Sequence, residues 1–295
     1  MQKIGFIGIG IMGKPMAKNL IDAGYSLVAY DICTDALEEI VSYGAKSSSS
    51  CKEVASQCDI IITMLPNSPE AKEAVLGKDG MIEGIKKGQI FVDMSSISPL
   101  VSQELAKELA KKSVEMLDAP VSGGQEKAQL GTLAIMVGGK AEIFNQCKAI
   151  LEVMGKPVLV GDIGAGGTTK LVNQVIVAIN IAAVAEGLIL GKKAGVDPER
   201  IFEAIKGGLA GSQCLTDKAP RMFQGKYDPG FKMKLHVKDL NNVLETSREL
   251  HTAMPLSAQV MEMMQSLLAE GYNELDHGSL ALFYEKLNNV CLKKK

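Results

Sequence analysis

Residues 3–20 have the sequence KIGFIGIGIMGKPMAKNL, which predicts the first structural unit of the chain. The apolar residues Ile4–Ile7 are typical of a short buried strand. They are followed at once by Gly8, Gly10 and Gly13, after which apolar residues recur at helical spacing. The segment therefore predicts a strand, a tight turn and a helix in direct succession.

The spacing of these glycines indicates a binding site for a dinucleotide. In such a turn the first glycine permits the sharp bend, the second lets the backbone approach a pyrophosphate, and the third lets helix and strand pack closely. Free N–H groups at the start of the helix then face the phosphates. The turn residues Ile11 and Met12 belong to the same predicted cofactor site. The alternative is a glycine turn with a structural role only.

Asp31 supports the dinucleotide interpretation. It ends a second predicted strand, residues 25–31, roughly 20 residues after the glycines, where this fingerprint has an acidic residue. A carboxylate there accepts hydrogen bonds from the ribose hydroxyls and repels the additional phosphate of NADP. Residues 32–34 contain no arginine, so the sequence favours NAD as the cofactor over NADP. Alternatively, Asp31 begins a turn or caps the next helix.

The first half of the chain alternates between predicted strands and helices. Helices are expected from residue 71 and from Pro99, with Ser98 as N-cap, to about residue 112. The remaining predicted strands are residues 59–65, 89–94, 114–118, 133–137 and 157–160. This alternation predicts a Rossmann-type, doubly wound α/β domain, in which helices cover both faces of a mostly parallel sheet.

Three loops follow predicted strands and are expected to line one crevice, because ligands of such sheets bind beyond the carboxyl ends of the strands. The third loop ends in Ser122, Gly123 and Gly124, whose hydroxyl and backbone N–H groups form a suitable cradle for a small carboxylate. A Ser-Gly-Gly turn without function is the alternative. The other two loops are assigned to the cofactor site through Leu65, Pro66, Ser95 and Ser96.

The pattern changes at the glycine-rich stretch 161–167, after which no strand is predicted. The sequence thus predicts two domains: a dinucleotide-binding domain, residues 1–163, and an all-helical domain, residues 164–295. Helices are expected at residues 170–194, 199–206 with Asp197 as its cap, 235–249, 255–270 and 277–291.

Polar residues interrupt the first of these helices. Lys170, Asn173 and Gln174 share one helix face, because positions three and four apart are neighbours. A lysine there is a plausible acid for protonating an alkoxide, since desolvation lowers its pKa from about 10.4. The alternative is a lysine whose ammonium group reaches solvent at the helix end. Further along, Lys238 and Asp239 are adjacent and are expected to point in different directions from a helix.

Composition limits the possible functions. The chain has 295 residues, of which 46% are hydrophobic and 22% charged, as in folded globular proteins. A net charge of −2 gives no electrostatic reason for nucleic-acid binding. The six cysteines form no Cys-x-x-Cys pair and the three histidines show no metal-ligand spacing, so we expect reduced thiols, no metal and a cytoplasmic location. The apolar stretch 175–190 is short for a membrane span and is expected to form a helix buried on nearly all sides.

Four motifs, in order along the chain, resemble those of the β-hydroxyacid dehydrogenases, and the likeness extends from Ile4 to about Lys286. They are GFIGIGIMG at 5–13, DAPVSGG at 118–124, GAGGTTKLVN at 164–173 and KDL at 238–240. The resemblance implies a Rossmann domain, an all-helical second domain and assembly through the helical part into a homodimer or homotetramer.

The resemblance also implies roles for individual residues. Lys170 would be the general acid and base, and Asn173 would orient a small-molecule substrate whose carboxylate is held by Ser122, Gly123 and Gly124. Lys238 would close over the cofactor site. Many relatives have Asn-Asn where this chain has Asn173-Gln174. The longer Gln174 side chain keeps the amide chemistry but changes its reach.

Within the family, residues 63–69, 93–97 and 205–212 are similar to the branch that reduces tartronate semialdehyde to glycerate with NADH. A branch that oxidises 3-hydroxyisobutyrate shares every motif above, so the shape of the substrate pocket separates the two. A non-catalytic NAD-binding module is the alternative from a different class.

Overall fold

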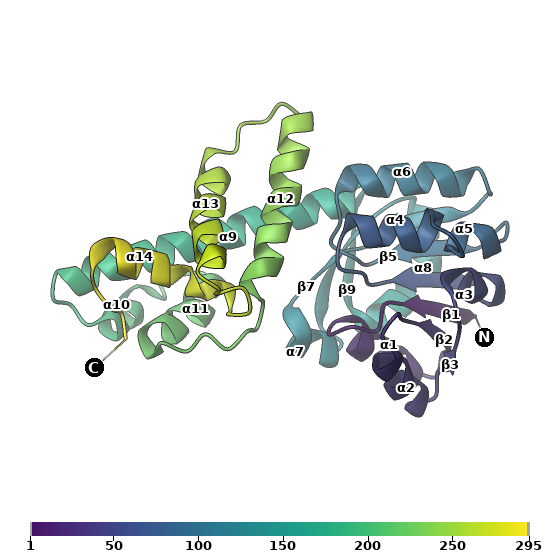
Figure 1. Ribbon diagram of the computed structural model, residues 1–295, viewed down its shortest axis with the longest axis horizontal. Coiled ribbons are helices and arrows are strands. Elements are labelled where there is room, and N and C mark those ends of the chain that lie inside the picture. The colour runs from purple at the N-terminus through teal and green to yellow at the C-terminus, as the bar shows by residue number, and fades with distance from the viewer. Residues whose placement is uncertain (1, 294–295) are drawn as a thin grey trace. The chain divides into compact units, whose positions relative to one another are not determined.

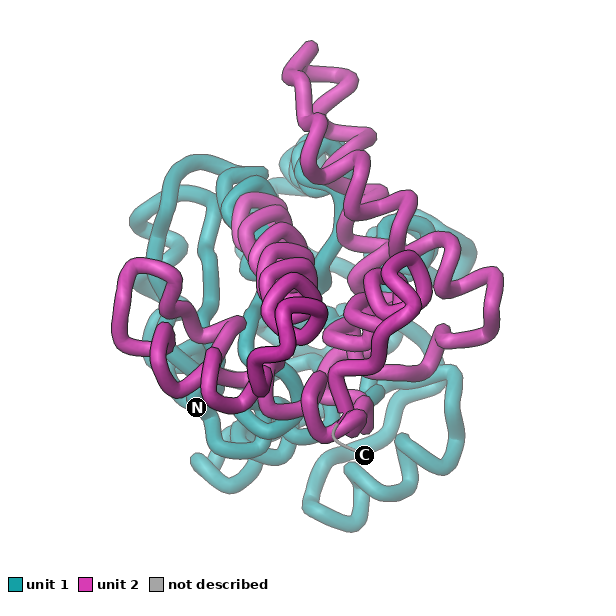
Figure 2. Tube along the Cα trace, turned by 90° about the vertical axis from the view of Figure 1, so that its left-hand side faces the viewer, with its two compact units in different colours: residues 1–170 teal, residues 171–295 magenta. Residues whose placement is uncertain are grey.

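The computed structural model describes residues 2–293. The chain forms two compact units, residues 1–170 and residues 171–295, which Figure 2 shows in different colours. The first unit is built from strands and helices in alternation, whereas the elements of the second are helices. The predicted fold class, a mostly parallel α/β domain followed by a helical domain, is confirmed.

A single sheet organises the first unit. Its strands are β1 (Lys3–Ile7), β2 (Ser26–Tyr30), β3 (Lys46–Ser47), β4 (Ile60–Thr63), β5 (Ile90–Asp93), β6 (Glu115–Asp118), β7 (Val121–Ser122), β8 (Leu133–Gly138) and β9 (Gly155–Gly161). They lie in the order β3-β2-β1-β4-β5-β6-β8-β7, and β9 pairs with β8. Pairing is parallel except where β8 meets β6 and β7. The carboxyl ends of β1, β2, β4, β5 and β6 therefore lie along one edge.

Helices cover both faces of this sheet, and the side chains of the central strands are therefore buried alternately on one face and the other. They are α1 (Gly13–Asp22), α2 (Thr34–Ser42), α3 (Cys51–Gln57), α4 (Ser68–Leu76), α5 (Met81–Gly84), α6 (Pro99–Ala110), α7 (Gly124–Gln129) and α8 (Ala141–Met154). One face packs against α3 to α6, where α4 and α6 lie side by side (Figure 1). The other face packs against α1 and α8.

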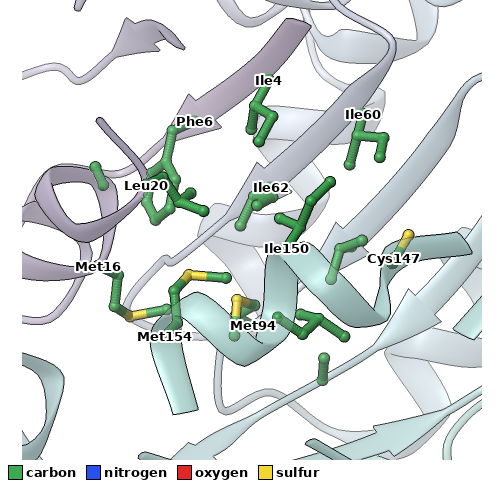
Figure 3. Close-up of a cluster of buried hydrophobic side chains, with 14 of the residues drawn as sticks. Ile4, Phe6, Met16, Leu20, Ile60, Ile62, Met94, Cys147, Ile150 and Met154 are labelled. Atoms are coloured by element: carbon green, nitrogen blue, oxygen red, sulfur yellow. The ribbon is translucent and has the colours of Figure 1, made fainter. Parts of the chain in front are cut away.

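Figure 3 shows the core on the second of these faces. Ile4, Phe6 and Ile62 extend from β1 and β4, and Ile150 and Met154 meet them from α8. The neighbours in β1 and β4, such as Ile7 and Ile61, belong to the core on the opposite face. This alternation explains why each central strand is apolar along its whole length, as the sequence shows.

Helices of the second unit surround a separate core. They are α9 (Ala165–Lys193, which begins in the first unit), α10 (Pro198–Ile205), α11 (Gln213–Gln224), α12 (Met233–Glu249), α13 (Pro255–Ala269), the 3-10 helix η1 (His277–Leu280) and α14 (Ala281–Asn288). Asp197 caps α10 as predicted, and its side chain accepts a hydrogen bond from the Glu199 backbone N–H. In residues 171–293 the only strand-like pairing is an isolated bridge between Lys232 and Asp276.

The long helix α9 is less buried than its sequence predicts. Only 39% of its most apolar 18-residue stretch is buried, and the side chains of Ile176 and Leu190 are 54% and 73% exposed. The prediction of burial on nearly all sides is therefore wrong. By length and composition alone this helix could cross a membrane. Its inner face, including Ile181, Ala185 and Leu188, instead packs into the core of the second unit.

A buried ion pair lies within the second unit. The Asp276 side chain is fully buried and lies 3.0 Å from the Lys218 ammonium group. Its two oxygens also accept hydrogen bonds from the backbone N–H groups of Gly230, Phe231 and Gly278. One carboxylate thus ties α11, the loop before α12 and the start of η1 together.

The six cysteines are free thiols that differ in accessibility. Cys33 and Cys291 are exposed. Burial raises the pKa of Cys51 and of Cys58 to about 11, and that of Cys147 to about 12. The buried thiols therefore remain protonated at neutral pH.

Candidate active site

The glycine turn after β1 is tightly packed at two of its three glycines. Gly8 has a φ of +95°, its N–H donates to the Tyr30 carbonyl, and a Cβ there would lie 2.4 Å from the Met64 carbonyl oxygen. A Cβ on Gly13 would lie 1.9 Å from the Gly8 carbonyl oxygen. Around Gly10, by contrast, a Cβ would meet nothing within 4 Å. The turn thus leaves open space at its middle glycine, where a ligand can approach the backbone.

The start of α1 favours an anion. Its N-cap residue, Met12, makes no side-chain capping bond, and the first turn contains no acidic side chain. The adjacent Ile11 is 56% exposed. The positive end of the helix dipole and the N–H groups of the first turn of α1 therefore meet no acidic side chain from the helix itself. This arrangement fits the pyrophosphate of a dinucleotide.

Asp31 links the glycine turn to the end of β2. One carboxylate oxygen accepts a hydrogen bond from the Ile9 N–H at 2.5 Å, and the other accepts one from the Cys33 N–H at 2.7 Å. Each carboxylate oxygen can accept a further hydrogen bond. Asp31 can therefore hold the turn and still accept a bond from a ribose hydroxyl.

A buried network joins the loops after β4 and β5. Asp93, at the end of β5, accepts hydrogen bonds from the Thr63 hydroxyl at 2.8 Å and the Ser95 N–H at 3.0 Å. The Ser95 hydroxyl in turn accepts one from the Leu65 N–H at 2.8 Å. Two of the predicted cofactor residues are thus bonded to each other, and Pro66 and Ser96 directly follow them. Sequence reasoning missed Asp93, although its place at the end of a predicted strand was a signal.

The loop predicted to bind a carboxylate contains two glycines with positive φ values. Ser122 ends β7, which pairs with β8, and Gly123 and Gly124 have φ values of +142° and +70°. A Cβ on Gly123 would lie 2.7 Å from the Lys127 side chain. Glycine is therefore required at this turn, and α7 begins directly after it.

Lys170 is held beside this loop. Its side chain is only 7% exposed, and its ammonium group donates a hydrogen bond to the Val121 carbonyl at 2.9 Å. Val121 is the residue before Ser122. The first unit therefore brings the predicted acid and the predicted carboxylate cradle together, although 49 residues separate Lys170 from Val121 along the chain.

The remaining predicted residues form a network within the second unit. Gln174 accepts a hydrogen bond from the Asn173 amide at 2.8 Å and donates one to Asp239 at 2.5 Å. The Lys238 ammonium group lies 2.9 Å from the other Asp239 oxygen. The expectation that Lys238 and Asp239 point in different directions is wrong, because the two charges pair.

Two histidines are buried in the core of the second unit. His277 Nδ1 lies 2.8 Å from His236 Nδ1, and His236 Nε2 lies 3.3 Å from the Gln174 carbonyl oxygen. Since that oxygen can only accept, His236 carries its proton on Nε2 and accepts from His277 at Nδ1. Within residues 2–293 no group of three or more His, Cys, Asp or Glu side chains is arranged to hold a metal ion.

Comparison with known proteins identifies the family of the chain. Residues 3–164 match the NAD-binding domain of 6-phosphogluconate dehydrogenase, and residues 164–284 match a domain described as the NAD-binding domain of NADP-dependent 3-hydroxyisobutyrate dehydrogenase. The chain is 42% identical to the 2-hydroxy-3-oxopropionate reductase of Escherichia coli K12, over 98% of this chain and 99% of that protein. The chain belongs to the 3-hydroxyacid dehydrogenase family. It is accordingly an NAD(P)-dependent oxidoreductase.

Other members of the family that resemble this chain have different names. A 2-(hydroxymethyl)glutarate dehydrogenase of Eubacterium barkeri is 37% identical over 98% of this chain and 97% of its own length. The structure of Mycobacterium tuberculosis 3-hydroxyisobutyrate dehydrogenase with L-serine has a TM-score of 0.89 and 27% identity, covering 96% of this chain and 99% of that one. Membership of the family therefore establishes the type of reaction and leaves the substrate to be argued from the site.

Proposed function

We propose that the protein uses NADH to reduce tartronate semialdehyde (2-hydroxy-3-oxopropanoate) to glycerate. The observation that carries this proposal is the buried Lys170 ammonium group, held 2.9 Å from the carbonyl that precedes the Ser122 loop. In this proposal Lys170 is the proton donor, and the Ser122 loop beside it binds the substrate carboxylate. The 42% identity to the E. coli reductase supports the choice of substrate.

The cofactor would be held by the first unit. Gly10 and the start of α1 would bind the pyrophosphate, and Asp31 would bind the ribose. The loops after β4 and β5 would contact the rest of the dinucleotide. When bound, NADH supplies the hydride. The full set that we assign to the cofactor is Gly8, Gly10, Ile11, Met12, Gly13, Asp31, Leu65, Pro66, Ser95 and Ser96, and the family resemblance adds Lys238.

Lys170 would supply the proton. As negative charge develops on the aldehyde oxygen, its ammonium group donates a proton and prevents an alkoxide from accumulating. In the reverse direction the neutral amine removes the hydroxyl proton. Ser122 and the N–H groups of Gly123 and Gly124 would bind the substrate carboxylate and so fix the aldehyde relative to Lys170. We assign the orientation of the substrate to Asn173 and its support to Gln174.

Comparison of two aldehydes tests the proposed substrate. The assay follows NADH oxidation by absorbance. We expect kcat/KM to be at least about tenfold higher with tartronate semialdehyde than with methylmalonate semialdehyde. One hydrogen bond to the substrate hydroxyl contributes a free energy that corresponds to this factor. The reverse preference would assign the chain to 3-hydroxyisobutyrate. No NADH consumption with any small semialdehyde would contradict the enzymatic proposal and favour an NAD-binding module.

Asp31 is expected to determine the preference for NADH over NADPH. In Asp31→Ala the ribose loses its acceptor and the NADP phosphate no longer meets a negative charge, so the NADH/NADPH ratio of kcat/KM should fall by roughly tenfold or more. Steady-state kinetics with each cofactor measures the ratio. Asp35→Ala, which removes an exposed carboxylate in the next helix, is the matched control and should leave the ratio unchanged. An unaltered ratio in Asp31→Ala would rule out this role.

A further inference from the structure

The Asp118 carboxylate joins the end of β6 to the first turn of α9. Asp118 is 1% exposed, and one of its oxygens accepts a hydrogen bond from the Gly164 N–H at 2.7 Å. The other oxygen accepts one from the Gly167 N–H, also at 2.7 Å. These amides lie where helix α9 begins, and the N–H groups of a first turn have no partners within the helix itself. A single side chain from the sheet thus satisfies two of them.

Close backbone packing leaves this turn little room to move. A Cβ on Gly166 would lie 2.4 Å from the carbonyl oxygens of both Asp118 and Met136, and a Cβ on Gly138 would lie 2.3 Å from the Asp118 carboxylate. The start of α9 therefore rests directly on the strand ends of β6 and β8. Gly164, Gly166 and Gly167 offer no side chains to hold the turn, and glycine is a poor helix former. The carboxylate supplies the restraint that the glycines do not.

The same short segment also holds the Lys170 ammonium group. Val121, whose carbonyl accepts the Lys170 hydrogen bond at 2.9 Å, lies three residues after Asp118. Segment 118–121 therefore contacts α9 at two places. The Asp118 carboxylate binds the first turn of the helix, and the Val121 carbonyl binds Lys170. A shift or unwinding of the first turn would move the amine away from the Ser122 loop.

We propose that Asp118 is a positioning residue for Lys170: it fixes the first turn of α9 on the sheet and thereby holds the amine at the Val121 carbonyl. The proposal rests on the proposed function, in which Lys170 transfers the proton. It concerns a residue that we assign to neither the substrate nor the cofactor, and Asp118 acts through the helix that carries the acid.

The charge state of Asp118 suits this role at neutral pH. Burial raises the pKa of this carboxyl to about 6, an effect that the hydrogen bonds from Gly167 and Gly164 oppose and the neighbouring Asp93 carboxylate reinforces. The group is therefore mostly ionised at pH 7, where both oxygens are strong acceptors.

Asp118→Asn tests the proposal, because it keeps the shape while replacing one acceptor oxygen by an NH₂ group. In the full-length enzyme with NADH, we expect kcat to fall about 10- to 100-fold, with KM and the Kd for NADH changed little, because the acid is displaced while the binding groups remain. Asp162→Asn, in an exposed residue just before α9, is the control and should behave as wild type.

A second measurement requires neither substrate nor cofactor. The rate at which trinitrobenzenesulfonate modifies Lys170, followed by peptide mass spectrometry, should rise at least about fivefold in Asp118→Asn, because the turn opens more often. A folded variant with unchanged kcat and unchanged Lys170 modification would overturn the positioning role. If Lys170→Ala itself retained full turnover, the proposed function would fail, whereas faster modification would still support the positioning.

Hydrogen exchange in the wild-type protein gives a test that does not depend on a variant folding. The Gly164 and Gly167 amides are expected to exchange slowly, because both donate to a buried carboxylate. Exchange of either amide at the rate of an unstructured peptide would overturn the proposal.

Discussion

Lys170→Ala is expected to lower kcat by about 10²- to 10⁴-fold, the range that a positioned general acid contributes. The variant loses the only group that we assign to protonation of the aldehyde oxygen. The Kd for NADH should change little, because the glycine turn and Asp31 are untouched. Steady-state turnover and a fluorescence titration with NADH measure the two quantities separately.

The matched control for this variant is Lys193→Ala, at the other end of the same helix and exposed. It removes the same side chain from α9 without approaching the Ser122 loop and should keep wild-type turnover. Lys170→Arg is informative as well, since a guanidinium keeps the charge but releases a proton far less readily. Wild-type turnover in Lys170→Ala would exclude the proton-transfer role.

Asp276→Ala is expected to lower the free energy of unfolding by about 3–5 kcal/mol, the cost of removing one partner of a buried ion pair. The Lys218 ammonium group would lose its buried counter-charge, and three backbone N–H groups would lose their acceptor. Urea unfolding followed by circular dichroism measures the change.

Asp217 provides the control for this second prediction. Its carboxylate also lies 2.9 Å from the Lys218 ammonium group, but its side chain is 44% exposed. Asp217→Ala should therefore cost no more than about 1 kcal/mol, as for exposed ion pairs. Similar losses in the two variants would show that burial is not what makes the Asp276 contacts stabilising.

The apolar pattern was sufficient to predict the sheet but not all of its connections. Predicted strands 59–65 and 89–94 correspond to β4 and β5, because both faces of a parallel sheet are buried and its strands are apolar throughout. Helix α2 was missed because it is short and buries only Ile40 fully, while Ala36 and Leu37 pack against the core from half-buried positions. Helix α11 was missed because Pro220 lies inside it and polar residues surround it. The two-residue strands β3 and β7 are too short to leave a pattern.

Local motifs and long-range contacts differ in how far the sequence reveals them. The glycine turn and Lys170 could be proposed because their chemistry is encoded in consecutive residues. The bonds from Thr63 to Asp93 and from Gly164 and Gly167 to Asp118 could not, because these partners lie 30 and 46 or more residues away along the chain. The pairing of Lys238 with Asp239 could not be predicted for another reason. Neighbouring residues leave a helix in different directions, but a long, flexible lysine side chain can still bend back to the next residue.

The contrast between the exposed and buried thiols has a practical consequence. Maleimide reagents attack the thiolate, so Cys51, Cys58 and Cys147, buried and with raised pKa values, are protected in the folded chain. Cys33 is accessible, and it follows Asp31 by two residues. A fluorophore attached there needs no introduced cysteine, and in a variant with Cys291 and the half-buried Cys214 replaced we expect its emission to report dinucleotide loading.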